Sequence, residues 1–337
     1  MSCCLTDTPS GRRISREAPM TSPSQDPAAG TGRILVIRGG AIGDFIVTLP
    51  LLAALKARLP GNRIEVLGYP HIADLARAHG LAEAVHPIES RPLAGFFAKG
   101  SVLDTGLSAF FAGFHLIVSH LYDPDLIFQS NVASVSRAQF LQGLHRPDES
   151  TQLHATDQIL EILHRLAIFD ADPVPRLAPP RKDPGQPGIL GVHPGSGSPR
   201  KNWPENRWAS LLEQLVIRSP TRFLLIGGEA EENRLERLAT RLPADRCDVL
   251  RSQPLVTVAE RLRGCRGFIG HDSGITHLAA ALGLPGIALW GPSPARVWSP
   301  RGGDIRPMQA QPGLESLEVS TVSQALLAHL PWLTTPD

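Results

Sequence analysis

Three short clusters of small, charged and hydroxyl-bearing residues could take part in chemistry on an anionic ligand. They are GGAIGD (39–44), HPGSGSPRKNWP (193–204) and HDSGITH (271–277). Small residues let a backbone approach an anion closely, hydroxyls and cations can contact it, and a carboxylate can take a proton from a substrate. We therefore ask whether the three clusters belong to one ligand site, and which elements position them.

In the second cluster, Ser196 and Gly197 precede two cations, Arg200 and Lys201. A helix is expected to begin near Pro204, so the ammonium group and the helix N-terminus would both favour negative charge. The stretch is not a Walker A loop, because its lysine is not followed by Ser or Thr. An ordinary solvated turn with surface cations explains the same residues equally well.

The third cluster opens a predicted helix over 274–282. Asp272 can cap this helix, while Ser273 and Gly274 contribute backbone N–H groups at its positive end. A diphosphate placed there would receive several N–H donors, with His277 one turn further along. In the alternative interpretation, Asp272 is only an N-cap and His277 is a buried histidine whose hydrogen bonds are satisfied.

The first cluster resembles a dinucleotide-binding fingerprint only superficially. Its glycines fall at 39, 40 and 43 rather than in G-x-G-x-x-G order, and the next predicted strand ends in Gly68-Tyr69 without a ribose-binding acid. A nicotinamide-dependent oxidoreductase is therefore disfavoured. Asp44, at a glycine-rich turn between strand and helix, is placed either to reach a ligand or to cap the helix.

Apolar runs and amphipathic segments alternate along the chain in two successive series. The first series predicts strands at 34–37, 64–67, 84–88 and 115–119 and helices at 45–59, 72–79 and 153–167. Pro50 is expected to kink or restart the first of these helices. The second predicts strands at 189–193, 223–226, 248–250, 267–270 and 286–290 and helices at 204–217, 229–242, 256–263, 274–282 and 319–330. The pattern is typical of α/β domains with parallel sheets. Ligands of such sheets bind beyond the carboxyl ends of the strands, where all three clusters lie, which favours a site in a cleft between two domains.

Breaks in this alternation give the expected domain boundaries. Residues 1–32 contain no apolar run and are expected to form a disordered tail. The proline-rich stretch 173–188 is expected to be a linker, because so many prolines cannot continue a helix or a central strand. One domain then covers 33–172 and the other 189–318, followed by a helix and tail at 319–337.

The composition narrows the class of function. With 337 residues, 42% hydrophobic and 19% charged residues and a formal net charge of +1, the chain is typical of a cytoplasmic globular protein and lacks the basic excess of nucleic-acid-binding proteins. Cys247 and Cys265 are expected to be buried thiols. The histidines lack zinc spacing and Asp123-Pro124-Asp125 lacks further ligands, so no metal site is predicted. No apolar run approaches the ~20 residues that span a bilayer.

Several separated motifs, in order, resemble the heptosyltransferase family, the family 9 glycosyltransferases that build the core of bacterial lipopolysaccharide. The matching stretches are GDFIVTLP (43–50), HPGSGSPRKNWP (193–204), IGGEAEENR (226–234) and DSGITHLAAALGLPGIALWGPSP (272–294). The resemblance implies a GT-B-like fold of two facing Rossmann-like domains, with the acceptor in the N-terminal domain and the donor nucleotide in the C-terminal one. Residues 90–150 resemble the family poorly.

The resemblance also implies roles for individual residues. Asp44 would be the general base and Lys201 would neutralise the departing diphosphate. Ser196 would contact phosphate as part of the loop that contains Gly197, and Glu231 would hold the ribose hydroxyls. The diphosphate and heptose would contact the third cluster, namely Asp272, Ser273, Gly274 and His277.

The implied reaction is inverting transfer of a heptose from an ADP-sugar to a lipid-linked or oligosaccharide acceptor, with no cofactor beyond the donor. It would take place in the cytoplasm or at the inner face of the cytoplasmic membrane. Two alternatives stay open: transfer of another sugar to a different surface glycan, and a non-catalytic nucleotide- or glycan-binding module of the same fold. Asp44 together with Lys201 and Asp272 favours catalysis, because a binding module needs no base.

Overall fold

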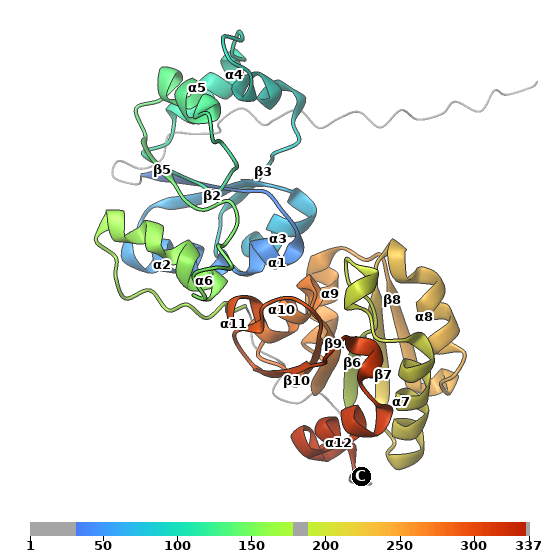
Figure 1. The fold of residues 1–337 in the computed structure, drawn as a ribbon. Helices are drawn as coiled ribbons and strands as arrows, with labels where there is room; N and C mark the ends of the chain where they lie inside the picture. Colours follow the sequence, from blue (N-terminus) through green and yellow to red (C-terminus); the bar gives the residue numbers. More distant parts are fainter. Residues whose placement is uncertain (1–31, 178–187, 335–337) are drawn as a thin grey trace, which may run out of the picture. The chain divides into compact units, whose positions relative to one another are not determined.

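The computed structural model describes residues 32–177 and 188–334, and the chain from Gly32 onward forms one compact unit. Each half of this unit contains a parallel β-sheet with helices packed on it (Figure 1). The expected tail 1–32 lies outside the described residues except for Gly32, and so does the 178–187 part of the expected linker. Among the described helices, none is long and apolar enough to cross a membrane.

The first sheet has the strand order β3-β2-β1-β4-β5 within the described residues, and every neighbouring pair is parallel. Its strand β1 is apolar at four successive positions and buried on both faces, which explains its central place. The strands are β1 (Arg33–Arg38), β2 (Arg63–Gly68), β3 (Ala84–Pro87), β4 (Leu116–Ser119) and β5 (Gln139–Gln142).

Helices cover both faces of the first sheet. In Figure 1, α4 (Thr105–Ala112) and α5 (Ile127–Val135) lie on one side of it, and the other helices of this half lie on the opposite side. These are α1 (Ile42–Ile46), α2 (Leu49–Arg58), α3 (Pro70–Ala78) and α6 (Ala155–Leu160). A proline in the first turn of α2 explains why the predicted helix 45–59 is two helices, because proline is tolerated there but not in a helix interior.

The second sheet has the order β11-β10-β9-β6-β7-β8 in the part of the chain that the structure describes, again all parallel. Its strands are β6 (Ile189–His193), β7 (Arg222–Gly227), β8 (Cys247–Arg251), β9 (Gly267–His271), β10 (Pro285–Trp290) and β11 (Asp304–Gln309). Its helices are α7 (Glu205–Arg218), α8 (Glu232–Ala239), α9 (Leu255–Leu262), α10 (Gly274–Ala281), α11 (Ala295–Trp298) and α12 (Val319–His329). Helix α12, expected to follow the domain, shares its core with α7 and α8.

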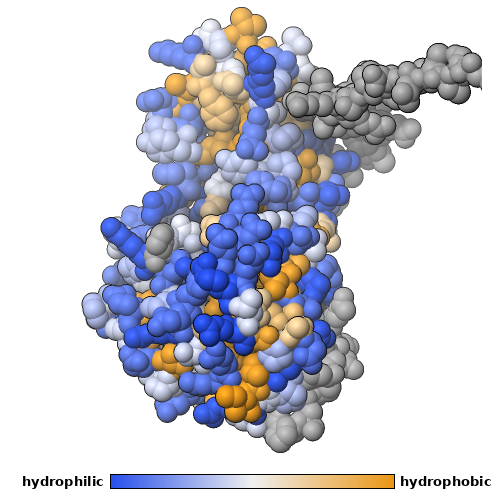
Figure 2. Space-filling model, turned by 90° about the vertical axis from the view of Figure 1, so that its right-hand side faces the viewer, coloured by the Kyte–Doolittle hydropathy of each residue, from blue (hydrophilic) through white to orange (hydrophobic). Residues whose placement is uncertain are grey.

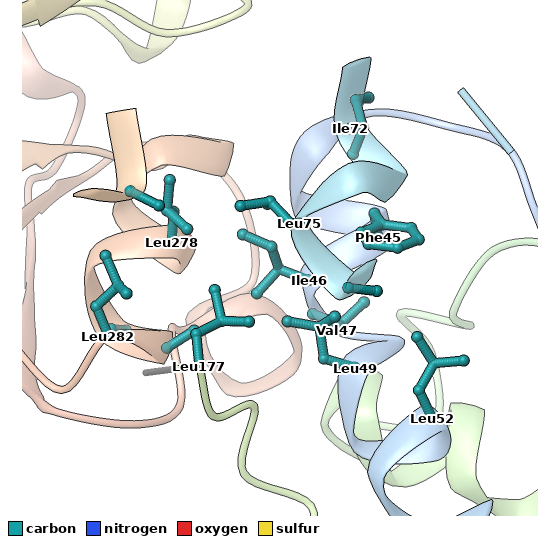
Figure 3. Packing of buried hydrophobic residues seen from close by; sticks show 14 of the residues in the cluster. Phe45, Ile46, Val47, Leu49, Leu52, Ile72, Leu75, Leu177, Leu278 and Leu282 are labelled. Carbon is teal, nitrogen blue, oxygen red and sulfur yellow. The ribbon is translucent and has the colours of Figure 1, made fainter. Parts of the chain in front are cut away.

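One hydrophobic core continues from the first half into the second. Ile46 of α1 and Leu75 of α3 belong to the same buried cluster as Leu278 and Leu282 at α10 (Figure 3). Leu177, the last described residue before the gap, is in this cluster too, and its N–H donates to Ala281 O at 2.8 Å. The carboxyl ends of the two sheets are therefore held near each other by apolar packing between helices.

Several observed elements were not predicted from the sequence. Helices α4 and α5, strand β5 and the 3₁₀ helix Arg91–Phe97 all lie within 90–150, and α11 and β11 were also not predicted. The predicted helix 153–167 continues beyond α6 as a 3₁₀ helix, Glu161–Leu166. The 90–150 region also exposes large apolar side chains at Phe97, Val102 and Leu126. On the largely hydrophilic face in Figure 2, hydrophobic areas occur at the height of α4 and α5 in Figure 1.

Candidate active site

Gly274 lets α1 and α10 approach each other closely. A Cβ on Gly274 would lie 2.6 Å from Ile42 Cβ and 3.0 Å from the Gly43 nitrogen, so only glycine fits there without movement. On the α1 side, a Cβ on Gly43 would lie 3.6 Å from the His277 ring. This contact joins the turn after β1, which carries Asp44, to the turn after β9, which carries Asp272.

A pocket of about 580 Å³ lies at this junction. Its lining combines the turn after β1, the loop after β5, the loop after β6, the start of α10 and the segment after β10. The lining residues are Ala41, Gly43, Asp44, His145, Arg146, Glu149, Gly197, Ser198, Lys201, Asp272, Ser273, Gly274, His277, Ser293 and Trp298. Seven of the nine predicted site residues are thus brought together, and the other two, Ser196 and Glu231, do not line the pocket.

Asp44 is the third residue of α1 and its side chain is 31% exposed. Its Oδ2 accepts a hydrogen bond from the Ala41 N–H at 2.9 Å, and its Oδ1 lies 3.6 Å from Nη2 of Arg38. The interpretation of Asp44 as the N-cap is wrong, because Ala41 is the N-cap of α1 and Asp44 accepts from its N–H as in a capping box. The Asp44 carboxylate also lines the pocket.

Arg38, the last residue of β1, connects Asp44 to the rest of the site. Its side chain is buried; Nε donates to Asp44 O at 3.2 Å and Nη1 donates to His145 O at 2.8 Å. Burial lowers the pKa of Arg38 and the Asp44 carboxylate raises it. A buried guanidinium needs an ionic partner. The nearby carboxylate is therefore important for the fold as well as for the pocket.

Lys201 and Asp272 form an ion pair, with Nζ donating to Oδ2 at 2.5 Å. Asp272 is buried and the Lys201 side chain is 30% exposed. The interpretation of Lys201 as a solvated surface cation is wrong. The interpretation of Asp272 as the cap of α10 is also wrong, because Ser273 is the N-cap and its hydroxyl accepts from Thr276 N–H at 3.4 Å.

Ser196 and Glu231 are engaged in local structure. The buried Ser196 hydroxyl lies 2.8 Å from Ser198 O and 2.9 Å from Asn202 Oδ1, so it holds the loop after β6 together. Glu231 is buried, and its Oε2 accepts from the Gly228 N–H at 3.0 Å at the start of the helical segment that leads into α8.

His277 is buried in α10 near Gly43. Burial lowers its pKa to about 4, although the nearby charges of Asp272 and Asp44 act in the opposite direction. Its ring makes no hydrogen bond to another residue in the described ranges 32–177 and 188–334. The interpretation of His277 as a buried histidine with satisfied hydrogen bonds is therefore wrong, and a neutral imidazole is available to a ligand in the pocket.

The loop after β5 contributes to the site but was not predicted from the sequence. His145, Arg146 and Glu149 line the pocket from this loop, and Glu149 Oε1 accepts from Trp298 Nε1 at 2.9 Å. These residues follow the carboxyl end of a parallel strand, as the three predicted clusters do. The same positional rule would have predicted these residues, but only if β5 had been recognised as a strand in the sequence.

No group of three metal-ligating side chains occurs among the residues that the structure describes. Asp123, the first residue of the Asp-Pro-Asp pair, accepts hydrogen bonds from the N–H groups of Phe128 at 3.1 Å and Gln129 at 2.9 Å. It therefore stabilises the start of α5. The expectation of buried thiols is confirmed for Cys265, whose pKa burial raises to about 12, but it is wrong for Cys247, which is only half-buried. Burial and the nearby charge of Asp248 raise the pKa of Cys247 to about 11.

Two parallel-sheet α/β domains with a shared pocket at their carboxyl ends define the class of fold found in GT-B glycosyltransferases. The family model for glycosyltransferase family 9 (heptosyltransferase) matches residues 142–314. Lipooligosaccharide heptosyltransferase 2 of Haemophilus influenzae is 31% identical over 303 residues, covering 77% of this chain and 83% of that protein. Lipopolysaccharide heptosyltransferase 1 of Pseudomonas aeruginosa is 25% identical over 292 residues, covering 77% and 79%.

Solved structures agree with this assignment at the level of the fold. The Escherichia coli heptosyltransferase WaaC with ADP gives a TM-score of 0.68 at 21% identity, covering 87% of this chain and 98% of that one. A family 9 glycosyltransferase from Veillonella parvula gives 0.69 at 16% identity, covering 90% and 97%. The chain belongs to glycosyltransferase family 9 and is an enzyme of that class. The predicted family and the GT-B-like fold are confirmed.

Proposed function

We propose that this enzyme transfers a heptose from an ADP-sugar to an acceptor of the lipopolysaccharide-core type, with inversion at the anomeric carbon. One observation carries the proposal: the carboxylate of Asp44 lines the same pocket as Lys201 and the N-terminus of α10. The relatives named above are lipopolysaccharide and lipooligosaccharide heptosyltransferases, and one solved structure of similar fold contains ADP.

In this proposal, Asp44 takes the proton from an acceptor hydroxyl as its oxygen attacks the anomeric carbon. The bond between that carbon and the β-phosphate oxygen breaks on the opposite side, and ADP leaves with the bonding electrons. Attack and departure on opposite sides require the base and the anion site to face each other across the sugar. General-base assistance of this kind contributes about 10²–10⁴-fold to the rate.

The negative charge that develops on ADP would be stabilised from the other side of the pocket. Lys201 donates to Asp272 through Nζ and has two further N–H bonds for phosphate oxygens. The first N–H groups of α10, at Ser273 and Gly274, lie at the positive end of the helix. These groups supply charge stabilisation without requiring a metal ion. Asp272 would fix the ammonium group and His277 would contact the sugar or phosphate.

We extend the proposal to the two domains and to the remaining site residues. The first domain, 33–172, would bind the acceptor and the second, 189–318, the nucleotide. Ser196 and Gly197 would form the phosphate loop, with Ser196 supporting it from within. Glu231 would bind the ribose through Oε1, because Oε2 already accepts from Gly228. A lipid-linked acceptor would require contact with the inner face of the cytoplasmic membrane.

The test is a transfer assay with ADP-heptose and heptose-deficient lipopolysaccharide core. We expect ADP release that depends on the acceptor, together with an increase in acceptor mass of one heptose. Acceptor-dependent release from a different nucleotide-sugar would favour the transfer of another sugar. Binding of ADP-sugars without release of ADP to any glycan acceptor would indicate a binding module and contradict the proposal.

A further inference from the structure

We propose that His271 is a positioning residue that anchors both ends of the phosphate loop, defined as residues 194–203. The inference rests on the proposed function, in which this loop supplies Lys201. It concerns a residue outside the motif DSGITHLAAALGLPGIALWGPSP (272–294), which begins one position later.

Both ring nitrogens of His271 bind the backbone of the loop. Nδ1 lies 3.1 Å from Gly195 O, and Nε2 lies 2.8 Å from the Trp203 nitrogen. Because the Trp203 N–H is a donor, Nε2 carries no proton, so Nδ1 carries the proton and donates to Gly195 O. The ring is fully buried, and burial lowers its pKa to about 3 in spite of the hydrogen bond to Gly195. The neutral form that makes both hydrogen bonds is therefore present at any pH near neutrality.

The two anchor points enclose the part of the loop that faces the pocket. Gly195 precedes this part and Trp203 follows it, while Lys201 lies between them and reaches Asp272, the next residue after His271. One imidazole thus fixes the entry and exit of the loop, and its neighbour in sequence fixes the cation.

The anchor is itself rigidly held. The Trp203 side chain is fully buried and its Nε1 donates to Leu317 O at 3.0 Å. The ring of Trp208 packs edge-on against His271, with 5.3 Å between ring centroids. His271 is therefore held against fixed neighbours. Its two hydrogen bonds to the loop backbone, at Gly195 and Trp203, distinguish it from a histidine that only fills space.

The first test measures the loop directly. In His271→Phe, which keeps an aromatic ring but neither hydrogen bond, we expect amide hydrogen exchange in peptides covering 194–203 to become at least tenfold faster. The control is Leu326→Ala, a buried core change in α12, which weakens the same domain. Equal exchange of the loop in His271→Phe and wild type, or equal acceleration in both variants, would overturn the inference whether or not ADP binds.

The second test links the anchor to the ligand through calorimetry with ADP. We expect His271→Phe to raise the Kd at least tenfold and His271→Gln, whose amide oxygen can accept from the Trp203 N–H, to raise it less. In a Lys201→Ala background the same His271→Phe change should raise the Kd less than threefold, because the loop no longer carries the cation. An equal effect in both backgrounds would contradict the inference. Failure of the wild-type protein to bind ADP, with a destabilised loop in His271→Phe, would instead contradict the proposed function.

Discussion

The Asp44→Asn variant tests two roles of the same carboxylate: the proposed general base and the ion-pair partner of Arg38. The carboxylate is the proposed base, and it is also the acidic group 3.6 Å from the buried guanidinium of Arg38. Loss of the base should lower turnover by about 10²–10⁴-fold. Removing one partner of a fully buried pair costs about 3–5 kcal/mol. Because the Asp44 side chain is 31% exposed and its charge is screened by water, we expect about 1–2 kcal/mol here.

Asp44→Ala is the matched comparison. The Asn side chain keeps an oxygen that can accept from the Ala41 N–H, whereas Ala does not, so Ala should be less stable than Asn by a further ~1 kcal/mol. Both variants should lose turnover to the same extent and keep nearly the wild-type affinity for ADP. The assays are acceptor-dependent ADP release, calorimetry with ADP, and urea unfolding. Turnover in Asp44→Asn close to wild type would refute the assignment of the base. An unchanged free energy of unfolding would refute the pairing with Arg38.

Three further predictions concern the anion site, the contact between helices and the stability in acid. Lys201→Ala should raise the Kd for ADP at least tenfold, since a hydrogen bond from a charged donor is worth about 1.5–3 kcal/mol; an unchanged Kd in calorimetry would remove the phosphate role. Gly274→Ala should lower both kcat and the melting temperature, because its Cβ would lie 2.6 Å from Ile42 Cβ; wild-type values for both would show that the close approach is not required. Glu65 is buried, and burial alone would raise its pKa, but hydrogen bonds from His86 and Arg33 and their charges lower it from 4.5 to about 2. Because the pKa of Glu65 is lower in the folded than in the unfolded state, its ionised form stabilises the fold at pH values above the unfolded-state pKa. Glu65 should therefore contribute about 3 kcal/mol to the free energy of unfolding at neutral pH. Of this contribution, ~1 kcal/mol should be lost by pH 4 and most of the rest by pH 2. Urea unfolding of wild type and Glu65→Gln measures this, and a difference between them that does not shrink from pH 7 to pH 4 would contradict it.

The regular elements of the fold could be predicted because they are strongly patterned. Strands such as β1 and β7 are continuous apolar runs, and α7 places Trp208, Leu211 and Leu215 on one buried face. The missed strands β5 and β11 are both edge strands. An edge strand has one unpaired side, so β5 can be short and polar and β11 can contain Pro307. Neither strand therefore has the continuous apolar run that predicts a buried strand.

The composition of the site could be predicted from the sequence, but its hydrogen bonding could not. Asp44, Lys201 and Asp272 all follow the carboxyl ends of predicted parallel strands, and this was enough to assign them to one site. It could not show that Asp272 binds Lys201 rather than capping α10, because the two residues are distant in sequence and meet only after β6 and β9 pair. The loop that contains His145 was not predicted as part of the site because it follows β5, and β5 is an edge strand without the sequence pattern of a buried strand.

The central claim is that one pocket holds both the base and the site for the leaving diphosphate. A crystal structure of the enzyme with ADP tests it most directly. We predict the β-phosphate within hydrogen-bonding distance of Lys201 Nζ and the N–H groups of Ser273 and Gly274, with the Asp44 carboxylate opening onto the same space. ADP bound elsewhere, or a diphosphate with no access to Asp44, would contradict the account.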